Sequence, residues 1–152
     1  MPIQFTPGGV VQIPLSDGKI AYGVMLSKFP YWAFYPQTTE FGEDGAALGA
    51  PIFVVAVTKA AYSRGRWGKI TMRLPESALP AIPLFVRQDS MRPSHCITVD
   101  ANGNETPISV EEAKAFERSA VWAAEHIEDR LEDHYAGRPN KWAESLRVKD
   151  PR

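Results

Sequence analysis

The chain has 152 residues, of which 44% are hydrophobic and 23% are charged, and this is enough to bury the core of one globular domain. Its one cysteine, Cys96, excludes an internal disulfide, and its net charge of −1 does not by itself indicate a nucleic acid or membrane partner. No apolar run approaches the roughly 20 residues of a membrane-spanning helix, and residues 1–9 lack the basic and apolar regions of a signal peptide, so we expect a cytoplasmic protein.

A β-hairpin is the first element predicted along the chain. Residues 11–15 and 20–24 alternate on either side of a turn that contains Asp17 and Gly18. Glycine accepts the positive φ that such turns need, so an Asp-Gly pair between two alternating runs is a strong hairpin signal. Pro14 lacks a backbone N–H, which predicts that its strand lies at a sheet edge or is bulged at this residue.

Further extended segments follow the hairpin. The sequence predicts four more strands, and the apolar run in the second of them is typical of a central strand: residues 32–35, 52–57, 65–73 and 96–99. Residues 37–49 are polar and rich in glycine, so they are expected to form a loop. Prolines in residues 74–93 favour an extended segment. Four apolar residues of this segment are expected to pack on the sheet: Ile82, Leu84, Phe85 and Val86.

The C-terminal part of the chain, residues 109–146, is predicted to be helical. Ser109 and Glu112 have the spacing of a capping box, and Gly137 is suited to a helix C-terminus. Between them, apolar side chains recur at steps of three or four and form one helix face: Phe116, Ala120, Ala123, Ile127, Leu131 and Tyr135. A break near residues 119–122 remains possible, and residues 140–146 are expected to form a short last helix. We expect Trp122, Ile127 and Leu131 to pack the helix onto the sheet.

These elements predict an α+β fold in a single domain, residues 1–152. Its β-rich part, residues 8–100, is expected to form a twisted antiparallel sheet or an SH3-like barrel, followed by the C-terminal helices at residues 109–146. No metal, cofactor or nucleophile site is predicted. His126 and His134 lie eight residues apart with the cation Arg130 between them, which opposes metal binding. His95 and Cys96 are neighbours on a predicted strand and therefore point to opposite faces. We expect no enzyme, although an active site dispersed along the chain remains an alternative.

Two charged clusters are candidate binding surfaces. The first contains one tryptophan among four cations, a composition that can bind nucleic acid through a small barrel but is also common on a solvated strand face: Arg64, Arg66, Trp67, Lys69 and Arg73. The second contains five acids within nine residues of the predicted helix: Glu125, Glu128, Asp129, Glu132 and Asp133. Like charges four residues apart cost an isolated helix roughly 0.2–0.5 kcal/mol per pair. These acids are either a solvated helix face or a surface for a basic partner.

Two sequence blocks resemble the immunity protein 26 family of bacterial polymorphic toxin systems. The first block is Gly9-Val10-Val11-Gln12-Ile13-Pro14-Leu15-Ser16-Asp17-Gly18, followed by Tyr22-Gly23. The second block runs from Glu117-Arg118-Ser119-Ala120-Val121-Trp122 through Glu125-His126, Arg130-Leu131 and His134-Tyr135 to Gly137 and Asn140. Trp67 and the proline-rich segment lie between the blocks in the same order as in the family, so the resemblance spans residues 9–142.

The resemblance implies a cytoplasmic, non-catalytic bacterial protein that binds and neutralises a cognate toxin, as in contact-dependent inhibition. The expected partner is the C-terminal domain of that toxin. Many toxins that attack nucleic acids carry basic clefts, because they must attract phosphate. We therefore expect the acidic cluster, Glu125, Glu128, Asp129, Glu132 and Asp133, to contact the toxin.

Overall fold

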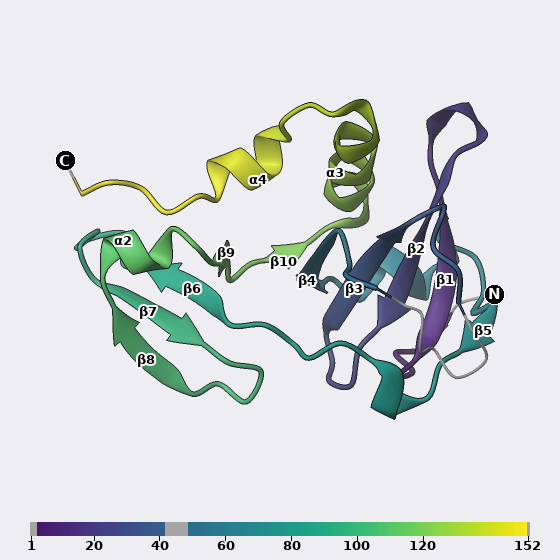
Figure 1. The fold of residues 1–152 in the computed structure, drawn as a ribbon, viewed down its shortest axis with the longest axis horizontal. Helices are drawn as coiled ribbons and strands as arrows, with labels where there is room; N and C mark the ends of the chain where they lie inside the picture. The colour runs from purple at the N-terminus through teal and green to yellow at the C-terminus, as the bar shows by residue number, and fades with distance from the viewer. Residues whose placement is uncertain (1–2, 42–48, 152) are drawn as a thin grey trace.

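A computed structural model describes residues 3–41 and 49–151 of the chain (Figure 1). Within these residues the chain forms two β-sheets and four α-helices, so the predicted α+β class with C-terminal helices is confirmed. Both sheets are open and mostly antiparallel, so an open sheet, and not a closed SH3-like barrel, describes this part of the chain. No helix in it is both long enough and apolar enough to span a membrane.

The first sheet contains six strands in the order β10-β4-β3-β2-β1-β5. Their bounds are β1 Gly9–Pro14, β2 Ile20–Met25, β3 Tyr31–Pro36, β4 Phe53–Val57, β5 Met72–Arg73 and β10 Val121–Trp122. β1 and β2 pair antiparallel around a turn in which Asp17 and Gly18 both have positive φ, which confirms the predicted hairpin. β5 pairs only with Gly9 and Val10, so Pro14 lies where β1 has no second neighbour among the described strands, as its missing N–H requires.

The second sheet contains four strands in the order β8-β7-β6-β9. Their bounds are β6 Phe85–Gln88, β7 Cys96–Val99, β8 Glu105–Ile108 and β9 Glu117–Arg118. β7 matches the predicted strand at 96–99. β8 was not predicted, because its polar, exposed residues lack an apolar alternation. It pairs antiparallel with β7 across the turn at residues 100–103.

The helices are short apart from one. Their bounds are α1 Ala60–Ser63, α2 Val110–Ala113, α3 Ala124–Ala136 and α4 Lys141–Ser145, and two turns of 3-10 helix lie at Ser16–Gly18 and Glu76–Ala78. The capping box of Ser109 and Glu112 begins α2, and Gly137 ends α3 with a φ of 69°, so both helix-end predictions are confirmed. Asn140 caps α4 by accepting a hydrogen bond from the backbone N–H of Ala143.

Two predicted elements were wrong in part. The apolar helix face does not begin at Phe116, because the chain breaks between α2 and α3 and forms β9 and β10 there; the possible break near residues 119–122 is therefore real. Of the predicted strand at 65–73, only Met72–Arg73 is a strand. The predicted loop at 37–49 holds no helix or strand at residues 37–41 and 49, and residues 42–48 lie outside the described part.

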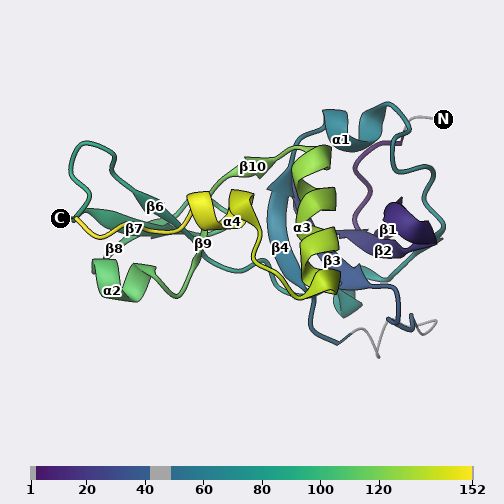
Figure 2. The same ribbon diagram turned by 90° about the horizontal axis from the view of Figure 1, so that it is seen from above.

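The main core lies between α3 and one face of the first sheet (Figure 2). Trp122, Ile127 and Leu131 are at most 3% exposed within it. The prediction that they pack the helix onto the sheet is confirmed for Ile127 and Leu131 of α3, whereas Trp122 lies on β10, a strand of the sheet itself. The opposite face of the sheet carries a second buried cluster that includes Val10, Tyr35 and Leu74. In the extended segment Phe85 and Val86 are buried, but Leu84 is 43% exposed, contrary to expectation.

Residues 117–122 join the two sheets. β9 pairs parallel with β6 at the edge of the second sheet, and β10 pairs parallel with β4 at the edge of the first. In Figure 1 this segment crosses from one sheet to the other, while the C-terminal tail returns over the second sheet. The side chain of Gln88 donates to the backbone carbonyl of Lys149 at 2.6 Å and accepts from its N–H at 2.9 Å, which attaches the tail to β6.

Candidate functional site

The five acids of the predicted acidic cluster all lie on α3, and each is engaged within the chain. Glu125 and Glu128 contact Arg66 on the loop after α1, whereas Glu132 accepts hydrogen bonds from Ser16 in the β1–β2 turn. The other two contact the segment that follows α3: Asp129 accepts from Trp142, and Asp133 accepts from Arg138 and Asn140. The acids therefore attach the helix to the first sheet and to α4 in addition to facing solvent.

Glu128 makes the densest of these contacts. It accepts hydrogen bonds from Nε and Nη2 of Arg66 at 2.8 and 2.7 Å, and from Nε1 of Trp67 at 2.9 Å. The hydrogen bond with Glu128 raises the pKa of Arg66. The Glu128 side chain is 20% exposed, whereas that of Glu125, which contacts the same guanidinium at 3.3 Å, is 65% exposed. Glu128 thus stabilises the packing of α3 against the loop that carries Arg66 and Trp67, whereas Glu125 is exposed to solvent.

Asp133 has a similar structural role at the other end of the helix. Its hydrogen bonds with Arg138 and Asn140 lower its pKa, and its side chain is only 18% exposed. Across the whole acidic cluster five carboxylates are balanced by two guanidiniums, those of Arg66 and Arg138. The face therefore keeps an excess of negative charge, and Glu125 and Asp129 are its most exposed members.

The predicted basic cluster does not form one surface. Trp67 is 1% exposed and packs in the main core, so it cannot stack on a nucleic acid base in this structure. Arg66 is bound to the acids of α3, and Nε of Arg73 donates to the backbone carbonyl of Pro7 at 3.2 Å. Arg64 and Lys69 are exposed. The structure thus brings two of these five residues, Arg66 and Trp67, into contact with the acidic cluster, inside the protein.

The histidines and the cysteine are separate from one another. The ring of His126 stacks on Trp142 with 3.7 Å between their centroids, and His95 and His134 are exposed. Cys96 is buried beside Val86 in the small core of the second sheet. Within residues 3–41 and 49–151, no group of three or more His, Cys, Asp or Glu side chains is arranged to hold a metal ion.

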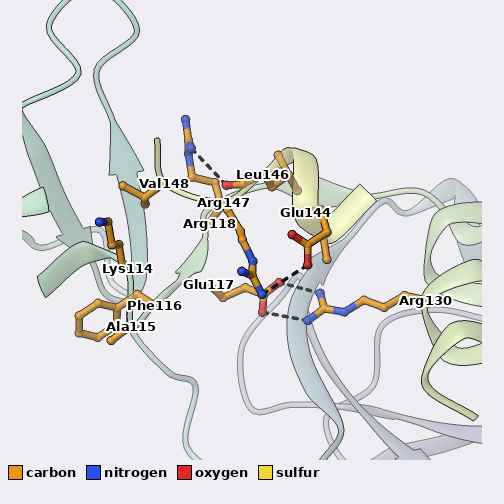
Figure 3. Close-up of a pocket in the computed structure, with 11 residues that line it drawn as sticks. Lys114, Ala115, Phe116, Glu117, Arg118, Arg130, Glu144, Leu146, Arg147 and Val148 are labelled. Atoms are coloured by element: carbon orange, nitrogen blue, oxygen red, sulfur yellow. Dashed lines mark hydrogen bonds and ion pairs between the residues drawn. The ribbon is translucent and has the colours of Figure 1, made fainter. Parts of the chain in front are cut away.

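A cavity of about 570 Å³ lies where the second sheet, α3, α4 and the C-terminal tail meet (Figure 3). Sequence reasoning missed it, because its walls come from segments that are far apart in the chain. It is lined by residues 114–118 before and within β9, by Arg130 of α3, and by residues 143–144 and 146–148. Four of these residues are cations and two are acids: Lys114, Arg118, Arg130, Arg147, Glu117 and Glu144.

Arg130 and Glu117 form the inner wall of this cleft. The two nitrogens of the guanidinium bind the two carboxylate oxygens of Glu117 at 2.6 and 3.1 Å (Figure 3). The guanidinium also lies over the rings of Phe53 and Trp122, at 4.0 and 5.0 Å from their centroids. Both side chains are largely buried, so this bidentate pair joins β9 to α3 and to the first sheet. Arg118 extends into the same cleft and donates to the carbonyl of Leu146 at 3.2 Å.

A comparison with protein families finds one match. The family model described as Immunity protein 26 matches residues 6–97, which is more than half of the chain. The matched region contains β1 to β5 of the first sheet, and β6 and the first two residues of β7 in the second. No curated protein and no solved structure matches the chain.

Proposed function

We propose that this chain, which belongs to the immunity protein 26 family, binds and neutralises a cognate bacterial toxin and catalyses no reaction itself. The family match is the observation that carries this proposal, because immunity proteins are named for protection against a toxin. The proposed partner is a C-terminal toxin domain of a polymorphic or contact-dependent system. The proposed place of action is the cytoplasm of the bacterium.

The arrangement of charged side chains supports binding over catalysis. The acids of α3 and β9 are engaged with cations from other segments, as in Glu128 with Arg66 of the loop after α1 and Glu117 with Arg130 of α3. Such bidentate pairs fix a surface in one shape. A rigid, charged surface favours fast and selective association with a protein of opposite charge.

The acidic face of α3 is the surface that we propose for contact with a basic toxin. Its excess negative charge remains after the ion pairs with Arg66 and Arg138 are counted. Glu125 and Asp129 offer the exposed carboxylates, while Glu128, Glu132 and Asp133 hold the helix in place. A toxin that cuts nucleic acid needs a basic cleft, and this face complements such a cleft in charge.

Co-expression tests the function directly. The toxin domain encoded beside this chain is expressed in a bacterial host with and without the chain, and survival is counted. We expect full protection and a stable one-to-one complex by gel filtration. Continued killing in the presence of well-folded protein, or the absence of a complex, contradicts the proposal.

The acidic face is tested by association kinetics. Glu125→Gln and Asp129→Asn together should slow association with the toxin about tenfold at low salt and flatten its salt dependence, because long-range steering is lost. Glu40→Gln with Glu76→Gln is the matched control, since it removes the same charge outside α3 and α4. Equal association rates for the two double variants at low salt would exclude the acidic face as the steering surface.

A further inference from the structure

Arg118 is the unusual cation of the cleft at the junction of the two sheets. It lies on the edge strand β9 and is partly buried. Its Nη1 donates a hydrogen bond to the backbone carbonyl of Leu146 at 3.2 Å. Among the described residues it forms no ion pair. A guanidinium has five N–H donors in a planar fork, so most of its binding capacity is open.

The other three cations of the cleft are already matched with acids. Arg130 holds Glu117 in the bidentate pair described above. Arg147 contacts Glu144 at 3.4 Å, and Lys114 contacts Glu111 and Asp150 at 2.8 and 3.0 Å. The acids of the cleft therefore have their own partners. A carboxylate that enters the cleft would therefore pair with the guanidinium of Arg118.

We propose that the cleft binds a carboxylate of an acidic segment of the partner protein, through the guanidinium of Arg118. This inference rests on the proposed function for the identity of that partner as the toxin. A partly buried guanidinium without a counter-ion is incompletely solvated, and a bidentate carboxylate restores both the charge balance and the hydrogen bonds. The toxin would thus be bound at two places: a basic surface of the toxin contacts the acidic face of α3, and an acidic segment of the toxin enters the cleft.

A second cavity beside the cleft indicates a protein segment as the occupant. It has a volume of about 210 Å³, shares Leu146 with the cleft, and is lined by Trp122 and Trp142. Val121, at its rim on β10, is 61% exposed. An acidic residue followed by apolar residues matches the chemistry of both cavities, whereas a free carboxylate matches only the cleft. Apolar side chains in aromatic pockets commonly carry much of the affinity of protein interfaces.

The experiment uses the full chain, two capped peptides and one small anion. Acetyl-Asp-Leu-Leu-amide, acetyl-Asn-Leu-Leu-amide and sodium acetate are titrated while NMR follows the backbone amides of residues 114–118 and 146–148. We expect the Asp peptide to shift these signals and to bind about tenfold more tightly than the Asn peptide, because a charge-assisted bidentate pair is lost in the latter. Acetate should bind more weakly than the Asp peptide.

Two variants of Arg118 and one control variant test whether peptide binding depends on this residue. Arg118→Gln should lower the affinity for the Asp peptide and for the toxin about tenfold. Arg118→Lys keeps the positive charge and a donor for the carbonyl of Leu146, so this variant should fold normally. Its affinity for the Asp peptide should lie between those of the parent and Arg118→Gln. Arg87→Gln is the control, because Arg87 lies on the neighbouring strand β6, is exposed and pairs with Glu105. It should bind as the parent does.

The outcomes separate this inference from the proposed function. Equal binding of the Asp and Asn peptides, or parental binding by folded Arg118→Gln, would overturn the carboxylate site. Acetate binding as tightly as the Asp peptide would overturn the choice of a protein segment. If Arg118→Gln still protects cells with parental toxin affinity, the cleft is not part of the toxin interface, although the immunity function stands.

Discussion

Two buried or partly buried tyrosines differ in whether their hydroxyl groups form hydrogen bonds. Tyr35 on β3 is fully buried, and its hydroxyl has no hydrogen-bond partner among the described residues. The hydroxyl of Tyr135 on α3 donates to the carbonyl of Ile20 at 2.7 Å and accepts from the N–H of Gln37 at 2.9 Å. The first group is desolvated and receives no hydrogen bond from residues 3–41 and 49–151, whereas the second joins the helix to the first sheet.

The two hydroxyls therefore predict opposite effects of the same substitution. Tyr35→Phe should raise the free energy of unfolding by about 1 kcal/mol, because it removes an unpaired buried polar group. Tyr135→Phe should lower it by about 1 kcal/mol, because it leaves Ile20 and Gln37 without their partner. Urea denaturation at pH 7 measures both values. Equal destabilisation by the two substitutions would contradict the assignment of Tyr35 as unpaired.

The stability of the protein at alkaline pH is a second test of the environment of Tyr35. Burial raises the pKa of Tyr35 from 10.0 to about 12. Between these values the unfolded chain has released the proton and the folded chain still holds it, so stability should fall as the pH rises from 10 towards 12. Repeating the denaturation series up to pH 11 should show a shallower fall for Tyr35→Phe than for the parent. Identical slopes would mean that Tyr35 titrates normally.

Glu128 and Glu125 share one cation but should differ in their importance for the fold. Glu128→Ala should lower the free energy of unfolding by about 1–3 kcal/mol, because it leaves the buried N–H of Trp67 and the guanidinium of Arg66 without their acceptor. Glu125→Ala removes an exposed ion pair and should cost about 0–1 kcal/mol. Thermal and urea denaturation of both variants test this order, and a larger loss for Glu125→Ala would reverse it.

At the scale of elements, α3 depends on its apolar face. Leu131 is fully buried against the first sheet, so Leu131→Ala should lower the free energy of unfolding by about 2–5 kcal/mol. Leu84→Ala is the control, because Leu84 is 43% exposed and should change stability by no more than about 0.5 kcal/mol. An unchanged melting temperature for Leu131→Ala would show that the helix buries another face.

The elements that sequence reasoning found are those with local signals. The β1–β2 hairpin follows from Asp17 and Gly18, and the ends of α2 and α3 follow from Ser109 and Gly137, because each signal acts through the backbone beside it. β9 and β10 carry no such signal. They are strands because they pair in parallel with β6 and β4, over 30 and 60 residues away in the chain, and those pairings override the helical pattern around Phe116.

The sequence predicted which residues form the candidate site but not how their side chains are arranged. The acidic cluster was found because its members are close in sequence on one helix. Its contacts with Ser16 and Arg66, and the meeting of Glu117 with Arg130, depend on the tertiary fold. The cleft around Arg118 was missed for the same reason, since its walls come from β9, α3, α4 and the tail.

At the scale of the whole molecule, the C-terminal tail holds the second sheet to the rest of the protein. Gln88 of β6 makes two hydrogen bonds with the backbone of Lys149, and Lys114 contacts Asp150 at 3.0 Å. Val148 packs against the small core around Val86. α4 links this tail to α3 through the stacking of His126 on Trp142. The tail therefore connects the acidic face with the wall of the cleft.

A stop codon after Leu146 should loosen the second sheet and leave the first intact. The truncation removes the contacts of Val148, Lys149 and Asp150, so the amides of β6 and β7 should exchange hydrogen at least about tenfold faster, whereas those of β2 and β3 should keep their protection. Lys149→Ala is the matched control, because both hydrogen bonds of Lys149 with Gln88 use its backbone, and it should exchange as the parent does. Because the tail also forms one wall of the cleft, the truncated chain should bind the Asp peptide more weakly while its acidic face still steers the toxin. Unchanged exchange in β6 and β7 would show that residues 117–122 hold the second sheet without help from the tail.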